Sequence, residues 1–76
     1  MASMSIDVER RRNPYRKLKA FIVEKGLSQK EVANYLEKSQ SALNQNLNGT
    51  GGDFSLSEAR SLMEKYKVPA EYFFEI

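Results

Sequence analysis

The chain has 76 residues, no cysteine and no histidine, and its formal net charge is +2. A chain of this length forms one small domain. The missing residue types exclude a disulfide framework, a thiolate metal site and histidine-based acid–base catalysis, so we expect no enzyme, no metal and no other cofactor. Because the chain lacks both a long apolar run and the apolar core of a secretory signal, we expect a cytoplasmic protein.

Positive charge is concentrated in the first half of the chain. Nine basic and three acidic residues lie between Arg10 and Lys38, whereas three basic and five acidic residues lie between Asp53 and Ile76. This asymmetry favours a polyanionic partner for the first half, although a solvated basic surface without a partner gives the same pattern.

Residues 1–12 show no hydrophobic periodicity and are predicted to form a flexible basic arm that contains Arg10, Arg11 and Arg12. Such an arm can follow a DNA backbone or enter an A·T-rich minor groove. A disordered tail without a binding role is the alternative interpretation. The rest of the chain, residues 13–76, is predicted to form one domain.

The first helix is predicted to begin at Asn13 and Pro14, since asparagine is a good N-cap and proline suits the first helical position. Its helical periodicity gives one apolar stripe: Tyr15, Leu18, Phe21 and Ile22. Gly26 is expected to end it in a left-handed conformation.

The second helix is predicted to open with a capping box formed by Ser28 and Glu31. Its inward face consists of Val32, Ala33 and Leu36. A third helix is expected from about Ser39 to Leu47, with Leu43 and Leu47 one turn apart as its buried pair.

A second capping box, Ser55 with Glu58, predicts a fourth helix that reaches about Tyr66. The residues expected to be buried on it are Leu56, Ala59, Leu62 and Met63. After Pro69 we expect a short last helix, Ala70 to Phe74, with Phe73 packed on the core. No strand pattern is convincing, so the predicted fold is all-α with five helices.

The third helix has an unusual polar face formed by Gln40, Ser41, Asn44 and Gln45. Solvent-exposed helix faces usually carry lysine and glutamate, and this face carries neither. Glutamine and asparagine can donate and accept hydrogen bonds together, which matches the N6/N7 pair of adenine in the major groove of DNA. The four residues are therefore candidates for reading bases, and an ordinary polar face of a small bundle is the alternative.

Groups suited to DNA phosphates surround this face. Gln29 lies at the start of the second helix, where free backbone N–H groups favour an anion. Lys30, Ser39 and Asn48 are the other candidates, and Thr50 is a weaker one. Lys30 is equally consistent with a solvated lysine. Contacts of this kind would position a domain on DNA without reading its sequence.

The C-terminal segment is rich in large aromatic residues: Tyr66, Tyr72, Phe73 and Phe74. One short helix does not bury four such rings, so some of them are expected at the surface. Tyr72 and Phe74 are candidates for contacts in a homodimer. A secondary apolar cluster over the fourth helix is the alternative.

Residues 27–49, LSQKEVANYLEKSQSALNQNLNG, resemble the helix-turn-helix of lambda-repressor/Cro-like DNA-binding proteins, and small phage Cro-like regulators in particular. The resemblance extends over about residues 15–74. It implies a compact five-helix domain that binds a palindromic operator in double-stranded DNA as a homodimer. By position, it makes Gln29 and Asn48 phosphate ligands, and it assigns the base-facing positions to Gln40, Ser41, Asn44 and Gln45.

Two residues depart from the pattern of these proteins. Glu37 occupies a turn position that is usually glycine, and Asn46 occupies a position that is usually apolar. If Leu47 takes over the packing from residue 46, the helix rotates slightly. The choice of base readers among Asn44, Gln45 and Asn46 is therefore open.

The sequence thus predicts a sequence-specific DNA-binding transcriptional regulator, specifically a phage or mobile-element Cro-like repressor that binds a palindromic operator through the major groove. The alternative is a protein-interaction module, such as an antitoxin or antirepressor, built on the same helical bundle. Neither prediction requires a small-molecule ligand or a membrane.

Overall fold

The structure is a computed structural model that describes residues 13–74. This part of the chain contains four α-helices, α1 (Arg16–Glu24), α2 (Gln29–Tyr35), α3 (Gln40–Asn48) and α4 (Leu56–Tyr66), then the 3-10 helix η1 (Ala70–Phe73). The all-α prediction is confirmed for the described residues. The count of five α-helices is not, because the last element is a four-residue 3-10 segment.

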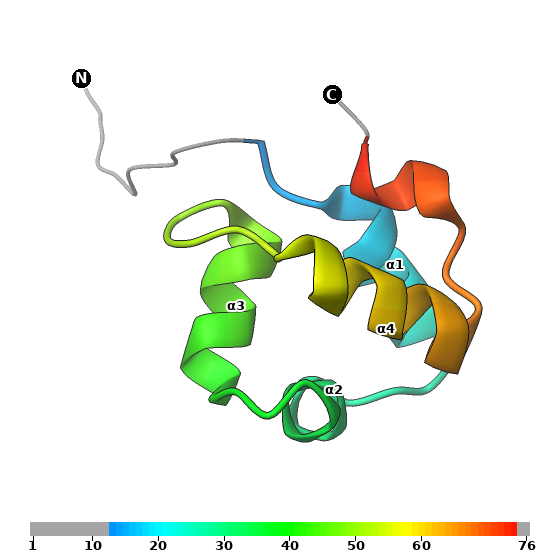
Figure 1. Ribbon diagram of the computed structural model, residues 1–76, viewed down its shortest axis with the longest axis horizontal. Coiled ribbons are helices and arrows are strands. Elements are labelled where there is room, and N and C mark those ends of the chain that lie inside the picture. The colour runs from blue at the N-terminus through cyan, green and yellow to red at the C-terminus, as the bar shows by residue number, and fades with distance from the viewer. Residues whose placement is uncertain (1–12, 75–76) are drawn as a thin grey trace.

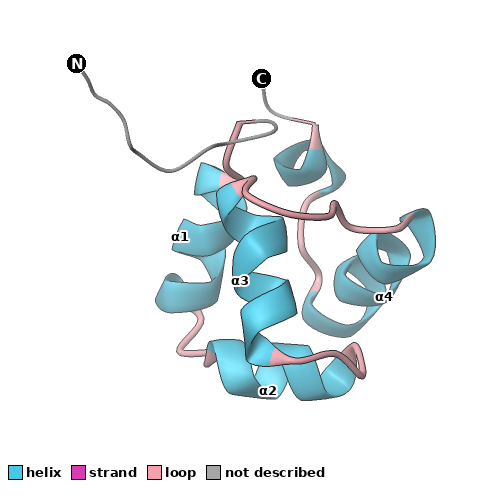
Figure 2. Ribbon diagram, turned by 90° about the vertical axis from the view of Figure 1, so that its left-hand side faces the viewer, coloured by secondary structure: helices cyan, strands magenta, loops and turns pink. Residues whose placement is uncertain are grey.

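The helices leave one side of α3 uncovered. In Figure 1, α3 stands at one edge of the molecule and α2 lies beside its N-terminal end. In the view turned by 90°, α3 lies in front, between α1 and α4, and α2 runs across its base (Figure 2). None of the helices in residues 13–74 is long and apolar enough to cross a bilayer. The predicted basic arm, with Arg10, Arg11 and Arg12, lies outside the described residues.

All five elements contribute to a single hydrophobic core. The predicted pair Leu43 and Leu47 is completely buried, which confirms the inward face of α3. Leu56, predicted to be buried, is 64% exposed, because the first residue of α4 lies on the outer side of that helix. The buried residues are Leu18, Phe21, Ile22, Val32, Ala33, Leu43, Leu47, Leu62, Val68 and Phe73.

Both predicted capping boxes are confirmed. The Oγ atom of Ser28 accepts a hydrogen bond from the backbone N–H of Glu31, and Ser55 and Glu58 form the same arrangement at the start of α4, each bond measuring 3.0 Å. These bonds satisfy N–H groups that a helix start leaves unpaired. The short helices therefore begin at defined residues.

The predicted start of the first helix at Asn13 and Pro14 is wrong. Helix α1 begins at Arg16, and Tyr15 is its N-cap residue, without a side-chain cap. The backbone N–H of Tyr15 instead donates to the carbonyl of Leu47 at 2.8 Å. This contact anchors the chain to the end of α3 and holds Tyr15 out of the helical conformation.

The turn between α2 and α3 contains a residue in the left-handed region. Glu37 has a φ of 60°, so the conformation that glycine usually supplies at this position is present without glycine. A left-handed backbone costs a residue with a side chain on the order of 1 kcal/mol. The backbone N–H of Lys38 donates to Ala33 at 3.0 Å and closes the turn. Helix α3 is therefore held directly against α2.

Candidate nucleic-acid interface

The polar face of α3 is exposed. Its four predicted base readers, Gln40, Ser41, Asn44 and Gln45, are all exposed to solvent, while the two leucines on the opposite side are fully buried. Among the described residues no other helix covers this side of α3, so this side of the helix can enter a groove of a partner (Figure 2). Gln40 and Ser41 form the first turn of the helix.

Both ends of α3 are fixed by specific contacts. Ser39 is the N-cap residue, and its Oγ accepts a hydrogen bond from the backbone N–H of Ala42 at 3.0 Å. The hydroxyl proton of Ser39 can still be donated to another group. At the other end, Gly49 has a φ of 75° and stops the helix. The polar face is therefore presented on a helix of defined length.

A row of hydrogen-bonded side chains joins α2, α3 and α1; we call it the amide row. Asn44 Nδ2 lies 3.5 Å from Gln29 Oε1, at the outer limit of a hydrogen bond. Asn48 Nδ2 donates to Asn44 Oδ1 at 2.9 Å, and Lys19 Nζ donates to Asn48 Oδ1 at 2.6 Å. The predicted phosphate ligands Gln29 and Asn48 are thus brought together with a predicted base reader.

Lys19 belongs to this site but was absent from the candidates derived from the sequence. Its position in the sequence could have suggested a contact with another helix. It lies four residues after Tyr15 and three before Ile22, at the edge of the apolar stripe. A lysine there is placed to reach a helix that crosses α1. By contrast, Lys30 is exposed on α2 and makes no hydrogen bond or ion pair within the described residues.

Gln45 lies against the loop that follows α3. A Cβ atom added to Gly51 would lie 2.9 Å from the Gln45 Cβ, closer than real Cβ atoms approach. The absence of a side chain at Gly51 therefore leaves room for Gln45. The backbone N–H of Thr50 also donates to the carbonyl of Gln45 at 3.2 Å, so Thr50 helps to form this turn.

Asn46 is not an exposed base reader, because it is only 4% exposed. Its Nδ2 donates to the carbonyl of Gly52 at 2.7 Å, and its Oδ1 accepts a hydrogen bond from Lys38 Nζ. A buried amide needs partners of this kind to compensate for the loss of water. The burial leaves Asn44 and Gln45 as the exposed candidates and confirms the packing of Leu47.

Lys38 points into the protein rather than toward solvent. Its Nζ lies 2.9 Å from Glu58 Oε2 and 5.5 Å from the centre of the Phe54 ring, and its side chain is 16% exposed. This contact could not be predicted from the sequence, because it joins the α2–α3 turn to a residue of α4 that lies 20 positions further along the chain.

The two predicted dimer residues differ in exposure. Tyr72 is half-buried, and its ring packs edge-on against Phe21 at 6.1 Å between centroids. Phe74 is 73% exposed. The prediction that part of the aromatic cluster lies at the surface is therefore confirmed for Phe74.

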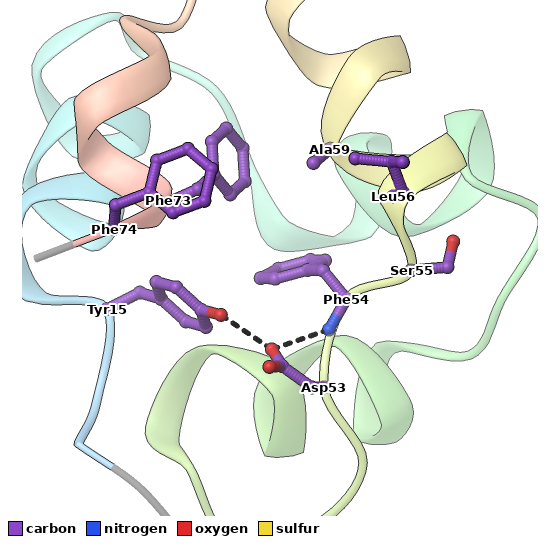
Figure 3. A pocket seen from close by; sticks show the side chains of 8 residues that line it. All are labelled: Tyr15, Asp53, Phe54, Ser55, Leu56, Ala59, Phe73 and Phe74. Atoms are coloured by element: carbon purple, nitrogen blue, oxygen red, sulfur yellow. Dashed lines mark hydrogen bonds between the residues drawn. The ribbon is translucent and has the colours of Figure 1, made fainter.

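A pocket of about 320 Å³ lies between α4 and η1 (Figure 3). Phe73 and Phe74 border it on one side and Leu56 on another, and the rings of Tyr15 and Phe54 also line it. The rings of Tyr15 and Phe54 pack edge-on at 5.3 Å, and Tyr15 also donates its hydroxyl to Asp53 Oδ1 at 2.6 Å. Exposed apolar side chains around a hollow are typical of an interaction surface.

Two helices joined by a tight turn, with an exposed amide face on the second, define a helix-turn-helix protein. A family model described as helix-turn-helix matches residues 18–73, which is most of the chain. The chain belongs to the lambda-repressor/Cro-like helix-turn-helix family, a family of DNA-binding regulators. No curated protein and no solved structure matches it.

The environment of Glu58 predicts how stability depends on pH. Burial raises the pKa of Glu58, but the hydrogen bond from the Ser55 backbone and the bond and charge of Lys38 outweigh burial, so the pKa lies below its ordinary value of 4.5. A depressed pKa stabilises the folded state above the unfolded pKa, and this contribution is lost as pH falls through the folded pKa.

We therefore expect Glu58→Gln to reduce the loss of stability between about pH 7 and about pH 3. Urea unfolding at both pH values measures the difference for each protein. Glu64→Gln, at an exposed glutamate of the same helix, is the matched control and should follow the unsubstituted protein. An identical pH dependence in all three proteins would contradict the assigned environment of Glu58.

Proposed function

We propose that the protein is a sequence-specific transcriptional regulator, a Cro-like repressor of a phage or mobile element. It binds a palindromic operator as a homodimer and reads it in the major groove. The observation that carries this proposal is the exposed, uncharged amide face of α3, opposite two completely buried leucines. The proposed readers are Gln40, Ser41, Asn44 and Gln45.

The first turn of α3 is proposed to supply the main base contacts. In helix-turn-helix complexes, the N-terminal residues of the second helix usually contact base edges. Gln40 and Ser41 occupy that turn, and their side chains form no hydrogen bond within the described residues. Asn44 is held by Gln29 and Asn48, so its amide is already oriented before DNA is present.

Phosphate contacts are proposed on both sides of this turn. The free hydroxyl proton of Ser39 can meet a phosphate oxygen at the start of α3, and the exposed ammonium of Lys30 can meet one at the start of α2. Gln29 and Asn48, which belong to the amide row, are also proposed to contact phosphates. Lys19 adds positive charge at the other end of this row. The proposal also includes arm contacts from Arg10, Arg11 and Arg12.

The homodimer is proposed to form through the apolar surface around the pocket. Phe74 and Leu56 are the exposed apolar side chains at its rim, and Tyr72 belongs to the same C-terminal segment. Two copies related by a two-fold axis would place their α3 helices in successive major grooves, about 34 Å apart. Occupation of the operator would then block transcription by exclusion of the polymerase.

The alternative is an antitoxin or antirepressor that uses this bundle to bind a protein. It also requires the apolar surface with Phe74, but it leaves the amide face of α3 dispensable. Variants of the amide face therefore separate the two functions.

We expect Gln40→Ala to lower the ratio of specific to nonspecific DNA affinity by about fivefold or more, because one bidentate base contact contributes roughly 1–3 kcal/mol of discrimination. Titrations with the preferred duplex and a scrambled duplex at fixed salt measure the ratio. Asn34→Ala, at an exposed amide outside α3, is the control and should retain it. Equal weakening on both duplexes would show that Gln40 contacts the backbone.

We expect Phe74→Ser to shift the protein toward monomers, since it removes the most exposed ring of the apolar surface. Sedimentation equilibrium over a range of concentrations measures the association. Val23→Ser is a matched control, because Val23 is 76% exposed on α1 and does not line the pocket. Unchanged association of the Phe74 variant would rule out this surface as the dimer interface.

A further inference from the structure

Lys38 is the centre of an internal polar network that joins three parts of the fold. Its ammonium donates to Asn46 on α3 and to Glu58 on α4, the latter at 2.9 Å. The other groups of the two partners are also engaged: Asn46 Nδ2 donates to Gly52, and Glu58 Oε1 accepts from the Ser55 backbone at 3.0 Å. We call Lys38, Asn46 and Glu58 the inner triad.

The inner triad joins the turn before α3 to the last turn of that helix. Lys38 directly precedes the N-cap residue Ser39, and Asn46 lies two residues before the end of the helix at Asn48. One ammonium therefore connects the turn that leads into α3 with the last turn of that helix and with the start of α4. An apolar side chain at residue 46 would fill space but would not provide these directional bonds.

The triad also restricts the rotation of α3 about its own axis. Successive residues of an α-helix are about 100° apart, so the buried Asn46 lies between the exposed Gln45 and the buried Leu47. Without Lys38, the buried Oδ1 of Asn46 would lose a hydrogen bond, and a rotation of the helix that exposes this atom to water would become more favourable. Such a turn would move the exposed amide face as well.

We propose that Lys38 is a positioning residue for DNA recognition: through Asn46 and Glu58 it fixes the orientation of α3 and therefore the direction of its base-reading side chains. This inference rests on the proposed function. It gives an indirect role in recognition to a lysine whose ammonium contacts Asn46 and Glu58 rather than the exposed face of α3. Recognition needs side chains held within roughly 0.5 Å and 10–20° of their productive geometry, which a short helix on a strained turn does not secure alone.

Two other roles for Lys38 make different predictions. A phosphate ligand would have to be accessible, whereas this side chain is 16% exposed and its ammonium faces Glu58 and the Phe54 ring. A contact that only stabilises the fold would change the fraction of folded protein, and so would weaken specific and nonspecific DNA binding equally. A positioning residue changes the ratio between them.

The test compares Lys38→Met, Glu58→Gln and the double variant with the unsubstituted protein. Methionine keeps the length of the lysine stem without its charge, and glutamine at residue 58 can still accept the Ser55 N–H. Glu58→Gln therefore keeps the test available if the Lys38 variant does not fold. Lys65→Met is the matched control, because Lys65 is an exposed lysine of α4 outside both the triad and the proposed DNA contacts.

Two measurements are made on each folded variant. Residual dipolar couplings of backbone amides give the orientation of α3 relative to α1 and α2 without DNA. Titrations give the ratio of specific to nonspecific affinity and the salt dependence of nonspecific binding. We expect both triad variants to reorient α3 and to lower the ratio about tenfold or more, with the salt slope unchanged. The double variant should lose no more discrimination than either single variant, since the triad acts as a unit.

Unchanged α3 couplings in a folded Lys38→Met or Glu58→Gln protein would overturn the inference, whatever happens to DNA binding. A salt slope reduced by about 0.9 in Lys38→Met would also overturn it, because that result identifies a phosphate ligand. If the unsubstituted protein shows no preference among duplexes, the proposed function fails, and the couplings still report separately whether the triad orients α3.

Discussion

The complete burial of Leu43 and Leu47 is the constraint on which the rest of this structure depends. A helix of nine residues is not stable in water by itself, so α3 forms only because these two side chains dock on the core. Because these two positions are one turn apart, the side of α3 that carries them must face the interior. The opposite side, with Ser41 and Gln45, must then face outward, and this side gives the fold its proposed function.

Two polar networks refine the position that the leucines define. On the outside, the amide row links Asn44 to α2 through Gln29 and to α1 through Asn48 and Lys19. On the inside, the inner triad links α3 to its preceding turn and to α4. Apolar packing tolerates small rotations, whereas hydrogen bonds have preferred directions. The combination holds a small helix in one orientation without disulfides.

The local features of the fold were predictable from the sequence. Capping boxes depend on residues three apart, so Ser28 with Glu31 and Ser55 with Glu58 specify two helix starts without any knowledge of the rest of the fold. The spacing of Leu43 and Leu47 likewise specifies the buried side of α3. These signals are short-range, and the structure confirms them.

Features that depend on how helices cross were not predictable in the same way. Asn13 fails as a cap because Tyr15 is tied to α3, an interaction that spans 32 residues. Leu56 has the right spacing for burial but lies on the outer side of α4. The contact of Lys19 with Asn48, and those of Lys38 with Asn46 and Glu58, likewise depend on the arrangement of the helices. Whether a residue is apolar or charged does not by itself show which residue it will contact in the fold.

The central claim is that α3 presents a sequence-reading face to DNA. Selection of bound duplexes from a random pool by the unsubstituted protein tests it most directly. The account predicts enrichment of one sequence motif with two-fold symmetry, whose half-sites are centred about one helical turn, roughly 10 base pairs, or a multiple of it apart. Recovery of duplexes with no common motif, under conditions in which the protein binds DNA, would contradict it.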